Sequence, residues 1–369
     1  MDTTDPDIVF DERGECGYVA DVRRLHASSW YPNETGANKL DRIVDRIKQD
    51  GRNRPFDCIV GLSGGLDSSY LALKMADYGL RVLAVHVDGG WNSETSVQNI
   101  ERICNHNNWD LFTHVIDWEE MRDLQLSYLR AGLVNQDVPQ DHAFFSMLWR
   151  KAVSMRIKWA LSGGNLASES ILPLAWRGHD AMDATHIRSV HKKYGSVRLA
   201  SYPSVGYFRY NVSYRLLKGM KVLKPLNYMP YVRESAISDL VQKAQWRPYG
   251  DKHHESIFTK FFQGYYLPTK FGFDKRKAHL SSMILSGQIT RDQALAEIEK
   301  PPFDEAEIDS QKDYIAKKLR IDRRELERLI VEPIVGNDRL PNGIWMKDLL
   351  LKSKATASRL IRLRGQDLG

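Results

Sequence analysis

Residues 56–69 read FDCIVGLSGGLDSS, a short apolar run followed by two glycines with hydroxyl side chains on both sides. The apolar half predicts a buried strand, and the half that begins at Asp67 predicts the start of a helix. Glycines let a backbone bend close to an anion, and the N–H groups of a first helical turn point toward it. The stretch therefore predicts a phosphate-binding loop between a strand and a helix.

The segments around this loop alternate between strand and helix patterns. Further strands are expected at residues 80–88, 111–116 and 159–162, and helices at residues 38–49, 67–78, 95–105, 144–155 and from 234 onward. Short links between alternating strands and helices favour a parallel sheet that is covered on both faces. We therefore predict an α/β fold with a doubly wound, mostly parallel sheet of Rossmann-like type, followed by a helical C-terminal region.

The chain divides into three stretches. Residues 1–50 are expected to form a turn-rich arm, up to about residue 30, and then an amphipathic helix; residues 51–250 the sheet domain; and residues 251–369 a helical region. The helices of the last region are predicted at 278–285, 291–300, 309–319, 323–331 and 345–363. The boundary is placed near Gly250 because the strand signals fade there.

Composition excludes several classes of protein. Of the 369 residues, 42% are hydrophobic and 27% are charged, which is typical of a globular chain rather than a disordered one. No apolar run approaches the ~20 residues that a membrane helix needs, so membrane insertion is not expected. The opening residues, MDTTDPDIVFDERGE, do not resemble a targeting segment, and a cytoplasmic location is the expectation.

The net charge of +6 is unevenly distributed. Residues 184–233 contain no Asp or Glu but hold ten Lys or Arg and seven Tyr. Cations bind phosphate, and aromatic faces stack on bases or sugars. We therefore predict that this basic, tyrosine-rich segment binds an anionic substrate, with Arg188, Lys192 and Lys193 as contact residues.

Two further turns are candidates for the same site. His86 and Asp88 end the second predicted strand, at the rim where open α/β sheets bind ligands. Residues 161–170, LSGGNLASES, form a second glycine turn after a later strand. There Gly163 and Gly164 are expected to face the ligand, which the resemblance described below implies is the α-phosphate or an adenylated intermediate, with Glu169 as a polar or metal-binding group.

These patterns give a set of candidate site residues. Asp67 is the expected ligand of a Mg²⁺ ion that bridges phosphates. The residues predicted to bind the phosphate-bearing ligand, which the resemblance described in the next paragraph implies is ATP, are Gly61, Ser63, Gly64, Gly65, Asp67, Ser68, Ser69, His86, Asp88, Gly163 and Gly164. The catalytic candidates are Asp67, Ser63, Lys252 and Glu169, and the dense cluster that continues from Lys252 through His253, His254 and Glu255 is predicted to contact the substrate.

SGGLDSS is similar to the pyrophosphate-binding loop of the PP-loop ATP pyrophosphatase superfamily, whose members cleave ATP to AMP and pyrophosphate while adenylating a carbonyl or carboxylate oxygen. The chain resembles one branch, the N-acetyl sugar amidotransferases of bacterial surface polysaccharide (O-antigen) biosynthesis. The matching stretches are TTDPDIVFDERGEC, HVDGGWNS, LSGGNLASES and YGDKHHESIFTKFFQGYYLPTKFGFDKRKAHLSS. The resemblance implies ATP and Mg²⁺, adenosine contact at residues 86–88, and conversion of an acetamido group on a nucleotide-activated sugar into an acetamidino group.

The cysteines argue against a built-in ammonia source. Cys58 falls in a predicted strand and Cys104 in a predicted helix, where neither resembles the nucleophile of a glutaminase. A separate glutaminase is therefore expected, and the resemblance implies a partner pair similar to the glutaminase and ammonia-channelling barrel subunits of histidine biosynthesis. The cysteine pairs that open related proteins are represented only by Cys16, so zinc, which needs about four ligands in a closed site, is not expected.

Three other functions share some of these residues. A PP-loop enzyme that modifies tRNA would use the basic, tyrosine-rich segment to bind RNA. Related thiolating enzymes carry cysteine pairs that this chain lacks, so nucleic acid is not the expected partner. An enzyme that amidates a sugar carboxylate would share every candidate residue, and a nucleotide-binding module without turnover would share the loop.

Overall fold

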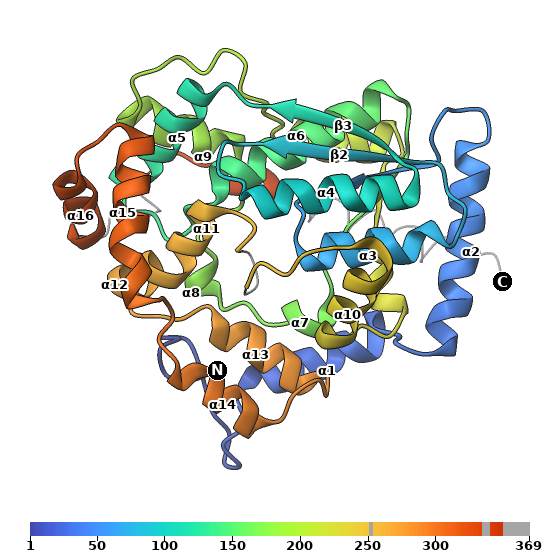
Figure 1. Cartoon of the computed structure of the whole chain (residues 1–369), viewed down its shortest axis with the longest axis horizontal. Coiled ribbons are helices and arrows are strands. Elements are labelled where there is room, and N and C mark those ends of the chain that lie inside the picture. Colours follow the sequence, from blue (N-terminus) through green and yellow to red (C-terminus); the bar gives the residue numbers. More distant parts are fainter. Residues whose placement is uncertain (251–253, 334–339, 350–369) are drawn as a thin grey trace.

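The molecule is built on a five-stranded parallel sheet, two strands of which are labelled in Figure 1. The computed structural model describes residues 1–250, 254–333 and 340–349. The strands are β1 (Cys58–Gly61), β2 (Val82–Asp88), β3 (Asp110–Val115), β4 (Trp159–Leu161) and β5 (Lys221–Leu223), in the order β3-β2-β1-β4-β5. All four pairings are parallel, which confirms the doubly wound parallel fold. The chain reverses its direction of travel across the sheet between β1 and β4, and open sheets bind ligands at such a point.

Helices cover both faces of this sheet. They are α1 (Gly17–Ser29), α2 (Glu34–Gly51), α3 (Leu66–Ala76), α4 (Glu94–Asn107), α5 (Trp118–Arg130), α6 (Val138–Ser154), α7 (Leu166–Glu169), α8 (Leu174–Arg177), α9 (Ala184–Tyr194), α10 (Arg233–Ala244), α11 (Ile257–Phe261), α12 (Leu267–Phe271), α13 (Arg276–Leu285), α14 (Arg291–Glu299), α15 (Glu305–Leu319) and α16 (Arg323–Val331). Two π-helical segments, Arg209–Leu217 and Phe262–Tyr266, and a 3₁₀ turn, Pro225–Tyr228, complete the described elements.

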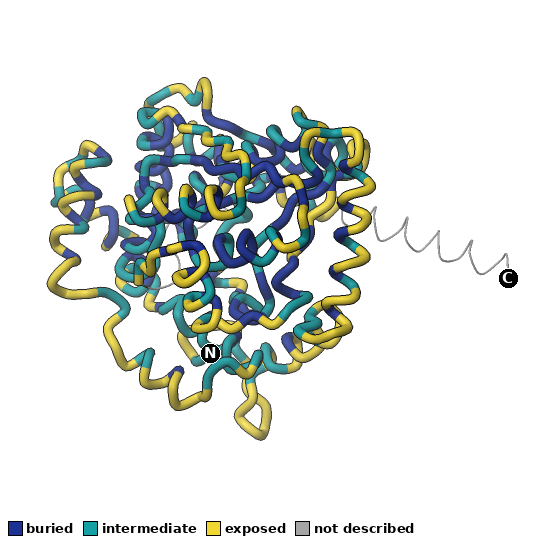
Figure 2. Tube along the Cα trace, turned by 45° about the vertical axis from the view of Figure 1, so that its right-hand side comes forward, coloured by how far each residue is buried: buried dark blue, intermediate teal, exposed yellow. Residues whose placement is uncertain are grey.

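The strands alternate between two hydrophobic cores, as the two-residue period of a strand requires. Ile59, Leu83 and Val85 point into a core that includes residues of α5, α6, α9 and the C-terminal helices. Val60 and Ala84 point into a second core, which includes residues of α2, α3, α4 and α10. Buried residues accordingly concentrate in the middle of the molecule, with exposed residues on the outer helices (Figure 2).

The helical C-terminal region packs directly onto the sheet. Phe258 and Phe261 of α11 and Leu326 of α16 belong to the same core as Ile59 of β1. Residues on both sides of Gly250 therefore contribute to one core. Helices α13 to α16 lie where the sequence predicts helices, and of the predicted helix at 345–363 only residues up to 349 lie within the described residues.

One local expectation is wrong, and one strand was not predicted. The predicted turn-rich arm contains a helix, α1, which the sequence hides because only Val22 of it is buried and no side chain caps it. It packs on α13, and the N-terminal amine beside it donates to Ser281 Oγ at 2.6 Å. Strand β5 is also unforeseen, since Lys221 and Val222 are exposed and only Leu223 is buried.

Across the described ranges, no helix combines the length and the apolarity needed to cross a membrane.

Candidate active site

A cavity of about 720 Å³ opens at the carboxyl ends of β1, β2 and β4. Its wall includes the glycine loop after β1, the turn after β2 and the second glycine turn after β4. The start of α6, the segment around residues 246–256 and the start of α13 complete the wall. The cavity therefore lies at the reversal point of the sheet, as the sequence predicts.

The glycine loop presents hydroxyl and N–H groups at the start of α3. Ser63 Oγ accepts from Gly65 N at 3.2 Å and lies 3.3 Å from Ser68 Oγ. Leu66 N donates to the hydroxyl of Tyr249 at 2.9 Å. These donors surround the positive end of an 11-residue helix, where an anion is stabilised.

Eight of the eleven residues predicted to bind ATP line the cavity: Gly61, Ser63, Gly65, Asp67, Ser68, His86, Gly163 and Gly164. Gly64, Ser69 and Asp88 lie behind the wall. Gly64 has a φ of +78°, and a Cβ there would clash with the backbone of Ser96 in α4. Asp88 accepts from Gly90 N at 2.7 Å and from Asn92 Nδ2 at 3.0 Å, so it shapes the turn after β2. These three residues support the wall rather than contribute to it.

The two glycine turns that carry Asp67 and Glu169 pack against each other. A Cβ on Gly163 would lie 3.0 Å from the backbone carbonyl carbon of Asp67, so the two turns pack tightly against each other. Asp67 Oδ1 accepts a hydrogen bond from Tyr231. Burial and then the neighbouring Asp67 raise the pKa of Tyr231 far above its usual value, so this hydroxyl stays a donor.

The second glycine turn also places a cation near the cavity. Asn165 Oδ1 accepts from Ser168 N at 2.9 Å and starts α7, and Glu169 Oε2 accepts from Asn165 N at 3.3 Å. A Cβ on Gly164 would lie 3.4 Å from Lys224 Nζ and 3.6 Å from Glu169 Oε2. The turn therefore carries the carboxylate of Glu169 and lies beside the ammonium group of Lys224, which follows β5.

His86 is held as a neutral ring behind the glycine loop. Its Nδ1 lies 3.0 Å from the carbonyl oxygen of Leu62, and its Nε2 lies 3.1 Å from Asn92 Nδ2. Burial lowers its pKa below the usual value. The ring therefore ties the loop after β1 to the turn after β2 without adding charge.

Glu255 comes to the glycine loop from 192 residues away in the sequence. Ser63 Oγ donates to Glu255 Oε1 at 3.3 Å, and a Cβ on Gly65 would lie 2.6 Å from the same oxygen. The segment is fixed by two backbone bonds, Ser93 N to Glu255 O at 2.9 Å and Ile257 N to Trp91 O at 2.8 Å.

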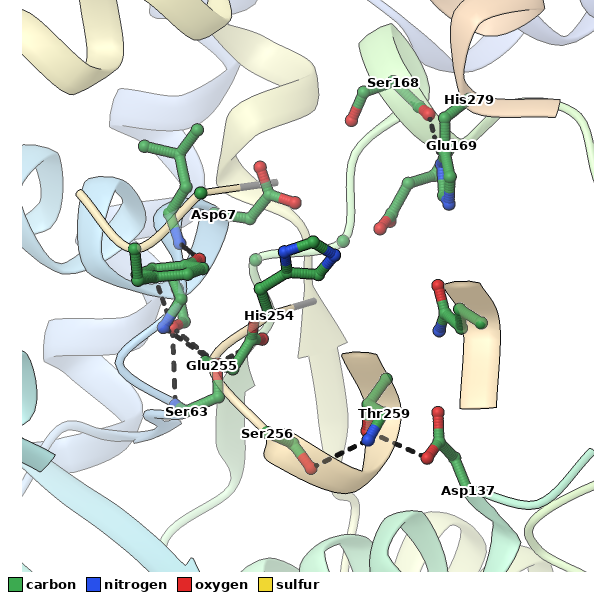
Figure 3. A pocket seen from close by; sticks show the side chains of 18 of the residues that line it. Ser63, Asp67, Asp137, Ser168, Glu169, His254, Glu255, Ser256, Thr259 and His279 are labelled. Carbon is green, nitrogen blue, oxygen red and sulfur yellow. Dashed lines mark hydrogen bonds between the residues drawn. The ribbon is translucent and has the colours of Figure 1, made fainter. Parts of the chain in front are cut away.

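The predicted titratable cluster thus reaches the loop in part. Figure 3 shows His254 and Glu255 on the same side of the cavity as Ser63 and Asp67, with Glu169 across from them. Lys252 and His253 lie outside the described residues.

The basic, tyrosine-rich segment does not form one binding surface. Arg188, Lys192 and Lys193 are exposed on α9, and no described residue of α9 lines the cavity. Four of the seven tyrosines, Tyr202, Tyr207, Tyr214 and Tyr231, are buried. Aromatic rings of this segment fill the cores, and α9 is packed on α5, where His191 Nε2 lies 3.0 Å from Asp123 Oδ2. Substrate contact by Arg188, Lys192 and Lys193 stays a prediction.

Several lining residues were not predicted as site residues. They come from the start of α6, from the loops around α10 and from the stretch that leads into α13: Asp137, Asp141, Tyr231, Arg233, Trp246, Tyr249, Lys275 and His279. Asp137 and Asp141 carry no motif, and acidic residues before a helix are commonly caps. Tyr249, Lys275 and His279 belong to the long stretch quoted for the resemblance, which is the one signal that pointed to them.

The two carboxylates at the glycine turns fit a magnesium ion. Mg²⁺ usually takes one or two protein carboxylates and completes its shell with phosphate oxygens and water. Asp67 and Glu169 supply that number. Within the described part of the chain, no group of three or more His, Cys, Asp or Glu side chains is arranged to hold a metal.

A comparison with known protein families gives a match in the C-terminal part of the chain. A family model described as "LPS biosynthesis protein WbpG-like, C-terminal domain" matches residues 255–346. No curated protein matches the chain.

Three solved structures are distantly similar in shape. An NMN synthetase from Francisella tularensis has 13% sequence identity and a TM-score of 0.39. The alignment covers 78% of this chain and 96% of the synthetase. An NH3-dependent NAD synthetase from Campylobacter jejuni has 13% sequence identity and a TM-score of 0.32. The alignment covers 80% of this chain and 97% of the synthetase. An NAD+ synthetase from Burkholderia pseudomallei has 15% sequence identity and a TM-score of 0.28. The alignment covers 60% of this chain and 93% of the synthetase.

The family match falls on the segment that supplies Glu255, Lys275 and His279 to the cavity. The match of the WbpG-like model to residues 255–346 supports the family expected from the sequence at this segment.

Proposed function

We propose that this chain uses ATP to activate the acetamido oxygen of a nucleotide-linked sugar and then joins ammonia to the same carbon. The products are an acetamidino sugar, AMP and pyrophosphate, and the setting is lipopolysaccharide O-antigen biosynthesis. The observation that carries the proposal is the glycine loop at the reversal point of the sheet, with a WbpG-like segment completing the cavity over it.

The loop suits the pyrophosphate end of ATP. The backbone N–H groups of Gly65 and Leu66 lie at the positive end of α3, where they bond to Ser63 Oγ and the Tyr249 hydroxyl. Both hydroxyls can turn their protons toward phosphate oxygens when those oxygens replace the present contacts. Donors fixed in this way favour the negative charge that builds up on a departing pyrophosphate.

Asp67 and Glu169 are the residues that would hold Mg²⁺. When bound, the ion neutralises phosphate charge and favours departure of the pyrophosphate. Lys224, whose Nζ lies beside Gly164 of the second glycine turn, would supply a positive charge for the remaining phosphate.

The chemistry needs no nucleophile from the protein. The acetamido oxygen attacks the α-phosphorus, pyrophosphate leaves, and the carbon becomes open to attack by ammonia, with AMP as the second leaving group. Positioning and charge neutralisation dominate such steps. The cysteines agree with this: burial raises the pKa of Cys104 to about 12 and that of Cys58 further, so neither thiol is a ready nucleophile.

Ammonia would come from a separate glutaminase, delivered through a barrel subunit similar to that of histidine biosynthesis. Turnover with glutamine by the purified chain alone would contradict this part of the proposal. Turnover with ammonium salts alone would support it.

The test is an ammonia-dependent assay across UDP- and CMP-linked acetamido sugars, with AMP and pyrophosphate quantified and the sugar product identified by mass. Exchange of oxygen for NH in one acetamido sugar would support the proposal. Amide formation from a uronic acid sugar in the same panel would assign the site to carboxylate amidation instead. Thiolation of added tRNA, with salt-sensitive binding, would assign it to RNA modification.

A further inference from the structure

The start of α6 brings two carboxyl groups into the cavity. Asp137 precedes the helix and Asp141 lies four residues later, so both project from the same face. Both residues line the cavity, where Asp137 is only 9% exposed and the accessible surface of Asp141 faces the open space. Phe144, three residues further along this face, packs against Gly61 at the start of the glycine loop. The face of α6 that carries the carboxyl pair therefore also contacts the end of β1, which leads into the glycine loop.

Polar groups from other elements converge on this pair. Thr259 Oγ1 of α11 donates to Asp137 Oδ1 at 2.9 Å (Figure 3), and Gln263 also hydrogen-bonds to Asp137. The charge of Lys275, just before α13, acts on both carboxyls. Side chains from segments distant in the sequence thus surround one end of the cavity. Three of these side chains, Thr259, Gln263 and Lys275, belong to the WbpG-like segment.

The groups around Asp141 shift its protonation equilibrium. The Asp141 side chain is exposed to the cavity, and its enclosure by the surrounding protein and then the charge of Asp137 raise its pKa to about 7. The titratable groups that act on Asp141 are Asp137 on its own element, Glu255 before α11, Lys275 before α13, and Tyr202. Glu255 acts in the same direction as Asp137, and Lys275 opposes them. A carboxyl that titrates near the working pH both accepts and releases a proton readily.

The amination step has a proton to dispose of. Ammonia attacks through its lone pair, and its nitrogen then carries a positive charge and one proton too many. Asp67 and Glu169 are assigned to the metal, and His86 is held between two hydrogen bonds with a lowered pKa. The proposed function assigns no nucleotide contact to the carboxyl pair at the start of α6.

We propose that Asp141, paired with Asp137, is the proton acceptor of the amination step, a role that rests on the proposed function. The nitrogen of ammonia forms a bond to the activated carbon, and the Asp141 carboxylate takes one proton from that nitrogen. The carbon–oxygen bond to AMP then breaks, and AMP leaves with the electron pair. Asp141 returns its proton to solvent, which leaves an amidinium product.

The experiment separates the two halves of the reaction in Asp141→Asn. The first half is followed as sugar-dependent exchange of labelled pyrophosphate into ATP without ammonia, and the second as amidine formed per free NH₃. We expect exchange to be little changed and amidine formation to fall by about 10² to 10⁴, the usual contribution of a positioned base. Glu101→Gln, at an exposed carboxylate on α4, is the matched control and should behave as wild type in both assays.

The pH profile supplies a second, independent readout. Wild type should lose amidine formation below a pH near the Asp141 pKa of about 7, and Asp141→Asn should lack this acid limb. Asp137→Asn removes a neighbouring negative charge, lowers the pKa of Asp141 and should move the limb to lower pH. That variant keeps the test open if Asp141→Asn fails to fold.

Each outcome decides something. Equal loss of exchange and amidine formation in Asp141→Asn, or normal amidine formation with an unshifted acid limb, overturns the role of Asp141. An acid limb that stays in place in Asp137→Asn overturns the pairing. Absence of sugar-dependent exchange in wild type contradicts the proposed function itself, and is thereby distinguished from failure of the proton acceptor alone.

Discussion

Adjacent glycines in the loop should fail in different ways when each is replaced by alanine. Gly64 has a φ of +78°, and a Cβ there would meet the backbone of Ser96. Gly65 has φ −71° and ψ 164°, which any residue adopts, and its Cβ would meet the ends of two side chains, Glu255 Oε1 at 2.6 Å and Ser63 Oγ at 3.0 Å. The first glycine is required by the fold, and the second is required by the ligand.

The magnitudes follow from these contacts. In Gly64→Ala the left-handed backbone costs about 1–2 kcal/mol, and the overlap with α4 adds about 1–3 kcal/mol. The free energy of unfolding should therefore fall by about 2–5 kcal/mol, a large part of the ~5–15 kcal/mol of an ordinary domain. In Gly65→Ala the smaller entropy of the unfolded chain offsets most of the strain, so stability should change by less than about 1 kcal/mol.

Affinity for ATP should respond in the opposite order. A methyl group on Gly65 keeps phosphate from the loop N–H groups, and each charge-assisted hydrogen bond lost costs about 1.5–3 kcal/mol. Binding of Mg²⁺–ATP to Gly65→Ala should weaken about 10- to 100-fold. Urea unfolding followed by tryptophan fluorescence and calorimetric titration with ATP measure the two effects. Normal stability of Gly64→Ala, or unweakened binding by Gly65→Ala, would refute this assignment of the two glycines.

Three further outcomes follow from named contacts. Asp67→Ala should abolish pyrophosphate release and leave the circular dichroism spectrum unchanged, and undiminished release would remove Asp67 from the mechanism. Glu255→Gln removes a negative charge next to Ser63 and should bind pyrophosphate several-fold more tightly without magnesium, since like charges no longer repel; weaker binding would contradict the geometry. Asp123 is 2% exposed; burial acts to raise its pKa, but hydrogen bonds from Val197, Ser196 and His191 outweigh this and lower it. Its contribution to stability is therefore present above the ordinary carboxyl pKa and lost as the pH falls through the lowered value. Asp123→Asn should unfold about 1.5–3 kcal/mol more easily at neutral pH and lose that acid dependence, as acid titration of urea unfolding will show.

The central part of the fold could be predicted because its signals are local. The apolar run before Ser63 gives β1, the glycines give the turn, and the stripe containing Leu71 and Met75 gives α3. Strand β5 could not be predicted, since two of its three residues are exposed and carry no alternation. Helix α1 forms through packing on α13, a contact that a local pattern does not contain.

The same distinction between local and distant signals applies to the residues of the site. Ser63, Asp67 and Gly163 stand in motifs, and these motifs predict them as site residues. The contact between Ser63 and Glu255 joins residues 192 positions apart, and nothing in either local sequence indicates it. Tyrosines such as Tyr202 and Tyr214 are equally suited to stack on a sugar or to fill a core, and only the packing of the molecule decides that they are buried.

Transfer of a heavy-oxygen label is the most direct measurement of the central claim, that the amide oxygen of a sugar takes the α-phosphorus of ATP. The chain would be incubated with ATP, magnesium, ammonium and an acetamido sugar labelled at its carbonyl oxygen, and AMP and pyrophosphate would be analysed by mass. The account predicts that the label appears in the phosphate of AMP, in amounts equal to the amidine formed. Label that remains on the sugar while ATP is consumed, or that enters pyrophosphate, would contradict it.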